Sequence, residues 1–178
     1  GLIRTETDKD GEREIVPIEI NEVTVDGENN PYYSHKSIFI DEHIRENTSL
    51  NVLAQLKPSF KKNGSVTAGN SSPLSDGAAF TLVASENFIK KHNLEPKARM
   101  VSYATAGVHP AYMGIGPVSA VPKALQLAGI NQNNIDIIEL NEAFAVQAIA
   151  VIDSLNFNPS ITNVNGGAVS LGHPLGVS

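Results

Sequence analysis

The stretch IDIIELNEAFAVQAIAVIDSL, residues 135–155, decides the fold of this 178-residue chain. Residues 135–140 form an apolar run of strand length, and a strongly apolar helical pattern follows over residues 142–155. A strand that leads directly into a helix is the repeating unit of α/β folds. The stretch therefore predicts an α/β domain with the polar pair Asn141-Glu142 at the carboxyl end of a strand.

The same alternation continues on both sides. Strands are predicted over residues 77–84, 98–106 and 161–164, and helices over residues 85–91 and 119–129. The run GAAFTLVA at 77–84 is typical of a strand buried on both faces, although its Ala and Leu content leaves a helix open. Ser119 is the predicted cap of the 119–129 helix, with Pro122 in its first turn and Gly129 at its end. The order βαβαβαβ implies crossover connections and largely parallel pairing within layers of helix.

Residues 1–72 are polar and irregular. Short β-like runs occur at residues 15–20 and 38–40, and a helix is expected over residues 49–56. The chain begins at Gly1 and stops inside a Gly- and Pro-punctuated turn, so we expect an excerpt from a longer polypeptide.

Charge and composition exclude several kinds of function. The chain carries 13 Lys plus Arg against 19 Asp plus Glu, a net charge of −6 that argues against nucleic-acid binding. Without a long apolar span we expect no membrane insertion and a cytoplasmic location. Because the chain contains no Cys, it can hold no disulfide, thiolate zinc site or cysteine nucleophile of its own. Four histidines lack metal-ligand spacing, so we expect no metal site: His35, His43, His92 and His109.

Two motifs carry polar side chains at predicted strand ends, where ligands bind in α/β sheets. NVNGGAVSLGHPLG (163–176) holds His173 between Gly172 and Pro174, and an imidazole with a pKa near 6.5 suits proton transfer. A surface-turn histidine is an equally open interpretation. In the second motif, the Asn141 amide can stabilise an oxyanion, and Glu142 can orient an imidazole. From the residues alone, a helix N-cap at Asn141 is favoured.

A third motif is VTAGNSSPLSDG, residues 66–77. Its small residues would let a slender ligand pass close to the backbone, with the hydroxyl of Ser71 or Ser72 as a partner. An ordinary loop rich in Asn, Ser, Gly and Pro explains the same composition. Met113 could line a pocket or fill a core.

Taken in order, the segments VTAGNSSPLSDGAA, MGIGPV, ELNEAFAVQA and NVNGGAVSLGHPLG resemble the thiolase family of acyl-CoA acyltransferases. The resemblance implies a layered α/β/α core preceded by an irregular loop domain, incomplete in this chain. Residues 1–72 would belong to the loop domain that binds CoA and mediates tetramerisation. Residues 73–97 would end the N-terminal thiolase domain, and residues 98–178 would form a truncated C-terminal domain.

The resemblance also implies roles for particular residues. His173 matches the histidine that activates a nucleophilic Cys and polarises a thioester oxygen, and Asn141 matches the asparagine that holds a water in an oxyanion hole. Glu142 would support that network as a third catalytic residue. The substrate-binding positions are those along the pantetheine arm and around the acyl pocket: Ala68, Ser72, Met113 and Phe144.

The implied reaction is Claisen condensation of two acyl-CoA molecules or thiolytic cleavage of a 3-oxoacyl-CoA, with CoA as substrate and no tightly bound cofactor. The family uses one Cys as acyl carrier and a second to move the α-proton. Since this chain has neither, we expect it to be inactive alone, and the full-length protein to be a homo-oligomer. The alternatives are a 3-oxoacyl synthase that uses acyl carrier protein and a non-catalytic lipid- or partner-binding module.

Overall fold

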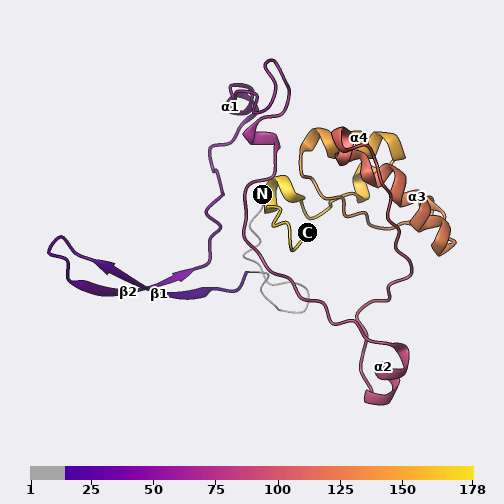
Figure 1. Ribbon diagram of the computed structural model, residues 1–178, viewed down its shortest axis with the longest axis horizontal. Coiled ribbons are helices and arrows are strands. Elements are labelled where there is room, and N and C mark those ends of the chain that lie inside the picture. Colours follow the sequence, from indigo (N-terminus) through magenta and orange to yellow (C-terminus); the bar gives the residue numbers. More distant parts are fainter. Residues whose placement is uncertain (1–14) are drawn as a thin grey trace. The chain divides into compact units, whose positions relative to one another are not determined.

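The computed structural model describes residues 15–178, which divide after Thr48 into two compact units (Figure 1). The first unit is built on an antiparallel hairpin of β1 (Ile18–Val25) and β2 (Pro31–Ile38). Its register sets Ile18 opposite Ile38 at the open end and Val25 opposite Pro31 beside the turn. Of the two predicted β-like runs, only residues 18–20 and Ile38 lie in strands. Most of β2 escaped prediction because its side chains are largely polar.

Asp26 organises the hairpin turn. Its Oδ1 accepts the backbone N–H groups of Glu28 and Asn30, each at 2.9 Å, and Asn29 adopts a left-handed conformation with φ of 67°. The N–H of Asn30, followed by that of Glu28, holds the pKa of the Asp26 carboxyl below its ordinary value. An ionised Asp26 therefore stabilises the turn.

In the second unit, Ser49–Ser178, the regular elements are helices. Its α-helices are α1 (Leu50–Ala54), α2 (Glu86–His92), α3 (Gly116–Ala128), α4 (Ala145–Leu155) and α5 (Ala168–Leu171). Its 3₁₀ turns are η1 (Ala68–Asn70), η2 (Pro110–Ile115), η3 (Gln132–Asn134) and η4 (Pro159–Ile161). Helices α3 and α4 pack together (Figure 1), and the core between them centres on Leu140, Ala148, Val151 and Phe157. Among residues 15–178, no helix has the length and apolarity needed to span a bilayer.

The helix ends follow the backbone preferences of the residues that form them. Ser85 caps α2 by accepting the N–H of Phe88, and α1 is capped in the same way by Ser49. Helix α3 ends as predicted at Gly129, whose φ of 66° requires no strain in glycine. The predicted start at Ser119 is wrong, since α3 begins at Gly116 with Pro117 in its first turn.

Among the predicted strands, the structure shows parallel pairing at one position. Ile138 and Thr162 form a parallel bridge, in which the Ile138 N–H donates to Ile161 O at 2.9 Å and the Asn163 N–H donates to Ile138 O at 2.8 Å. This is the parallel pairing that the alternation predicted. Residues 77–84 and 98–106 form no strand in the described chain, and Phe80 is 97% exposed instead of buried. An apolar run becomes a strand only beside a partner strand, and these two runs have none within residues 15–178.

Candidate active site

Asn141 and His173 lie side by side although 32 positions separate them in the sequence. Asn141 Nδ2 lies 3.3 Å from His173 Nε2. Asn141 follows the strand-like segment 135–140, and His173 follows α5 in the Gly-rich turn. The fold therefore brings together the two polar residues that the sequence placed at separate strand ends.

The distance and the atoms define what this pair can do. If the amide N–H donates, Nε2 of the imidazole is the unprotonated atom and is free to take a proton. Once Nε2 is protonated, the pair offers two neighbouring N–H donors, the kind of group that stabilises an oxyanion. His173 Nδ1 is buried without a hydrogen-bond partner among the described residues. Of the two ring nitrogens, only Nε2 has a described hydrogen-bond partner.

The turn around His173 is held against the loop at residues 75–77. Gly172 has a φ of 99°, and a Cβ there would come within 3.0 Å of Ser75 Cβ. A Cβ on Gly77 would come within 2.7 Å of Pro174 Cγ. Both glycines are needed for this close packing, which fixes the backbone on either side of the imidazole.

Asn141 does not cap the following helix. The N-cap of α4 is Phe144, which makes no side-chain cap hydrogen bond, and the helix begins at Ala145 and not at residue 142. The cap interpretation of Asn141 is therefore wrong. Its amide is available to His173 because the chain stays extended through Phe144 before it turns into the helix.

The hydrogen-bond partners of Glu142 are not Asn141 or His173. Its Oε1 accepts from Asn163 Nδ2 at 2.9 Å, and its Oε2 accepts from the Val169 N–H at 3.2 Å. Both carboxylate oxygens are thus used in linking the segment after Leu140 to the start of α5. A Cβ on Gly167 would overlap the same carboxylate, so only glycine fits beside it.

Asn163 had no predicted role, although it lies in the quoted NVNGG motif. Its Oδ1 accepts the Leu140 N–H at 2.7 Å, and its Nδ2 donates to Leu140 O at 2.8 Å as well as to Glu142. The side-chain amide thus makes the two hydrogen bonds to the Leu140 backbone that a neighbouring strand would otherwise make. The residue type was the only signal in the sequence, since Asn tolerates the left-handed φ of 50° found here better than most residues.

Two of the predicted substrate-binding residues lie together. Ser72 donates from both its N–H and its hydroxyl to Ala143 O, at 3.0 and 3.1 Å, and the neighbouring Ser71 forms an antiparallel bridge with Phe144. The loop at 71–72 is therefore attached to the segment that carries Asn141. Phe144 also packs edge-on against Phe60, at 5.7 Å between ring centroids, a contact that the sequence did not suggest.

The remaining predicted substrate-binding residues are placed by local turns. Ala68 opens η1, where Thr67 and Asn70 form a reciprocal capping box. Met113 lies in η2 and is 77% exposed. Gly114 next to it lies so close to Gln147 of α4 that a Cβ would be 2.6 Å from Gln147 Cγ. The structure does not bring Met113 into a closed pocket.

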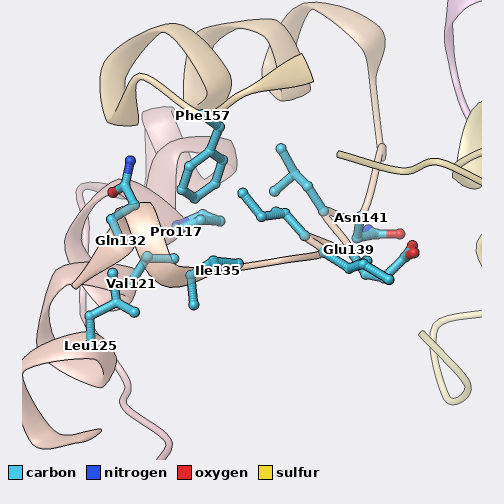
Figure 2. A pocket seen from close by; sticks show the side chains of 11 residues that line it. Pro117, Val121, Leu125, Gln132, Ile135, Glu139, Asn141 and Phe157 are labelled. Atoms are coloured by element: carbon cyan, nitrogen blue, oxygen red, sulfur yellow. The ribbon is translucent and has the colours of Figure 1, made fainter. Parts of the chain in front are cut away.

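A hollow of about 330 Å³ opens beside α3 (Figure 2). Its lining is mostly apolar, with Phe157, Val121 and Leu125 toward one end and Glu139 and Asn141 at the other (Figure 2). His173 and the predicted substrate-binding residues do not line it. The hollow therefore reaches the Asn141–His173 pair only through Asn141. In the part of the chain that the structure describes, no group of three or more His, Cys, Asp or Glu residues could hold a metal ion.

Comparison with known proteins identifies the class. The family model for the thiolase N-terminal domain matches residues 5–87, and that for the thiolase C-terminal domain matches residues 94–178. The chain belongs to the thiolase family, and its α/β fold is that of thiolase structures.

Individual relatives agree with this assignment. The mitochondrial 3-ketoacyl-CoA thiolase of Rattus norvegicus is 55% identical over 139 residues, and the acetyl-CoA acetyltransferase of Paracoccus denitrificans is 51% identical over 138. Each match covers 78% of this chain and 35% of the relative. A crystal structure of human mitochondrial 3-ketoacyl-CoA thiolase in complex with CoA superimposes with a TM-score of 0.77 at 52% identity, covering 80% of this chain and 36% of that one. The chain thus spans about a third of the length of these relatives.

Proposed function

We propose that this chain supplies one half of an acyl-CoA acyltransferase site of the thiolase type, with His173 as general base and Asn141 as oxyanion donor. The observation that carries the proposal is the 3.3 Å approach of Asn141 Nδ2 to His173 Nε2. A proton acceptor and an amide donor at one point match what acyl transfer between thiols requires. The names of the relatives, a 3-ketoacyl-CoA thiolase and an acetyl-CoA acetyltransferase, support the same chemistry.

The proposed steps conserve atoms and charge. His173 Nε2 takes the proton of a Cys thiol, and the thiolate attacks the thioester carbonyl of an acyl-CoA. The oxyanion that forms accepts hydrogen bonds from the Asn141 amide and the protonated imidazole. The carbon–sulfur bond to CoA then breaks, and the imidazolium returns its proton to the departing thiolate. Condensation with a second acyl-CoA, or its reverse, completes Claisen chemistry.

The thiol must come from outside these 178 residues, because the chain contains no Cys. We expect no acyl-enzyme when the chain alone is incubated with acetyl-CoA and analysed by intact-protein mass spectrometry. Stable acylation of the chain at one of its own residues would contradict the proposal that the nucleophile lies outside these 178 residues. Binding of CoA without acyl transfer in any longer protein that contains the chain would favour the non-catalytic module.

The substrate-binding proposal concerns Ala68, Ser72, Met113 and Phe144. Ser72 and Phe144 are joined through the 71–72 loop, close in sequence to Asn141, so a pantetheine arm that passes them would lead toward the Asn141–His173 pair. The CoA-bound relative is the comparison that motivates CoA as ligand. The Ser72 hydroxyl donates to Ala143 O and keeps its lone pairs to accept an amide N–H from the arm.

The decisive experiment uses an enzyme that carries this chain together with a nucleophilic Cys. His173→Ala should lower the rate of acyl-enzyme formation by about 10²- to 10⁴-fold, and Asn141→Ala by roughly 10²-fold. His92→Ala is the matched control, since His92 lies exposed at the end of α2, where its ring contacts Phe88. Near-normal acylation in His173→Ala would refute the assigned role.

Several finer assignments stay predictions within this proposal. They are the domain boundaries at residues 72 and 97, a homo-oligomer, the absence of a tightly bound cofactor, a role in fatty acid metabolism and a cytoplasmic location. The relatives include mitochondrial proteins as well as a bacterial one, so fractionation of tagged protein is the test of location. Light scattering on the longest natural form of the protein tests the oligomer.

A further inference from the structure

Glu142 makes no hydrogen bond to His173 or Asn141 among the described contacts, although it adjoins Asn141 in the sequence. We propose that Glu142 is a positioning residue, which together with Asn163 holds Asn141 and His173 in register. This inference rests on the proposed function, because positioning matters only if the pair carries chemistry. It assigns to Glu142 a role other than direct participation in catalysis.

The first half of the connection runs from Glu142 to Asn163. Asn163 is bound to Leu140 through two side-chain hydrogen bonds, at 2.7 and 2.8 Å, and to Ile138 through its backbone N–H at 2.8 Å. Its remaining amide hydrogen donates to Glu142 Oε1 at 2.9 Å. The residues on both sides of Asn141 are therefore tied to one asparagine.

The second half runs from Glu142 to the helix that precedes His173. Glu142 Oε2 accepts the N–H of Val169 in the first turn of α5, at 3.2 Å. Helix α5 is only four residues long and leads directly through Gly172 into His173. The position of the imidazole thus follows the position of α5. One carboxylate sets where both members of the pair lie.

The chemistry of the carboxylate explains why this position suits Glu. Both partners, an amide N–H₂ and a backbone N–H, are donors, and an ionised carboxylate offers two acceptor oxygens. A Gln of the same shape offers one acceptor and presents an N–H₂ group to the other donor. Glu142→Gln therefore breaks one of the two links without removing volume. Gly167→Ala displaces the carboxylate by another route, because its Cβ would overlap Glu142.

The test on the 178-residue chain is an NMR distance measurement. In the unmodified chain, a nuclear Overhauser effect should connect the Asn141 side-chain N–H₂ with the ring protons of His173. We expect Glu142→Gln and Gly167→Ala each to weaken it at least threefold, while the amide resonances of α4 keep their positions. Glu139→Gln is the control, since it makes the same charge change on an exposed residue three positions earlier. An unchanged effect in both variants, with the fold intact, would overturn the proposal.

A kinetic test separates positioning from chemistry and from simple destabilisation. In an enzyme that carries this chain and a nucleophilic Cys, kcat per titrated nucleophile should fall about 10- to 100-fold in Glu142→Gln, with KM changed by less than about twofold. The pH profile of kcat should keep its shape, because Glu142 exchanges no proton with substrate. Loss of one limb of the pH profile would mean that Glu142 donates or accepts a proton, and it would overturn the inference. An unchanged kcat per titrated nucleophile would also overturn it. Failure of the proposed function would appear separately, as undiminished acylation in His173→Ala.

Discussion

Residues 135–140 and residues 77–84 both have the composition of buried strands, but the structure treats them differently. Around Ile138 a single parallel bridge is reinforced by the Asn163 side chain, which bonds to Leu140 at two points, and Leu140 is buried. Residues 77–84 form no regular secondary structure, and Phe80 and Leu82 are 97% and 90% exposed. An apolar run thus becomes a buried strand only where a second segment pairs with it.

The same difference decides where a functional site can form. The Asn141–His173 pair lies where backbone and side-chain hydrogen bonds tie three segments together, so both side chains have fixed positions. No described hydrogen bond fixes residues 77–84 in this way. Catalytic groups must be held in place to a fraction of an ångström, so the hydrogen-bonded region around Asn141 and His173 is the better place for a site.

The largest expected effect contrasts two phenylalanines. Phe157→Ala should lower the free energy of unfolding by about 3–5 kcal/mol, because it empties a buried position in the α3–α4 core. Phe80→Ala should change it by less than about 0.5 kcal/mol, since almost the whole ring is already exposed. Urea unfolding followed by circular dichroism measures both values. Equal losses would mean that residues 77–84 are packed in solution.

Asn163→Ala tests whether a side chain can replace part of a sheet. It removes two hydrogen bonds to Leu140 and one to Glu142, each contributing roughly 1 kcal/mol, so we expect a loss of about 3 kcal/mol. Asn133→Ala serves as the control, because this exposed residue contributes only its backbone N–H to a described hydrogen bond. Similar stabilities of the two variants in urea would show that the Asn163 amide contributes little.

Two glycine substitutions should change the stability by smaller amounts and in opposite directions. Gly167→Ala should destabilise by about 1–3 kcal/mol, because the new methyl group overlaps the Glu142 carboxylate. Gly107→Ala should stabilise by about 0.4–1 kcal/mol, since nothing lies within 4 Å of its Cβ position and its φ is not positive. Thermal unfolding of the two variants should shift in opposite directions. Shifts of the same sign would contradict the packing at Gly167.

The smallest effect concerns the hairpin turn. The folded pKa of Asp26 is lowered, so its contribution to turn stability is complete above the unfolded value near 3.8 and is lost as the pH falls through the folded pKa. Amide exchange of Asn30 should therefore accelerate at acidic pH relative to the intrinsic rate. In Asp26→Asn this additional acceleration should be absent. An identical pH response in the variant would rule out the carboxylate as its source.

Sequence reasoning was most successful where local chemistry decides the structure. Ser85 and Gly129 were identified as helix ends because capping depends on residues close in the chain, and the structure confirms both. The thiolase resemblance was confirmed because it rests on ordered motifs.

What the sequence could not predict depends on distant partners. The exposure of residues 77–84 follows from a missing neighbour, which no local pattern reports. Helix α4 begins three residues beyond Glu142, whose carboxylate binds Asn163 and Val169, both more than 20 positions away in the sequence. The approach of Asn141 to His173 was an expectation from family motifs, and spacing alone left both residues open to structural interpretations.

A double-mutant cycle between Asn141 and His173 tests most directly whether the two residues act as one site. It would be run on acyl-enzyme formation, in an enzyme that carries this chain and a nucleophilic Cys. If both stabilise the same oxyanion, the double variant should be no more than about threefold slower than His173→Ala alone. If the double variant instead loses the product of the two single effects, the residues act independently and the shared site is contradicted.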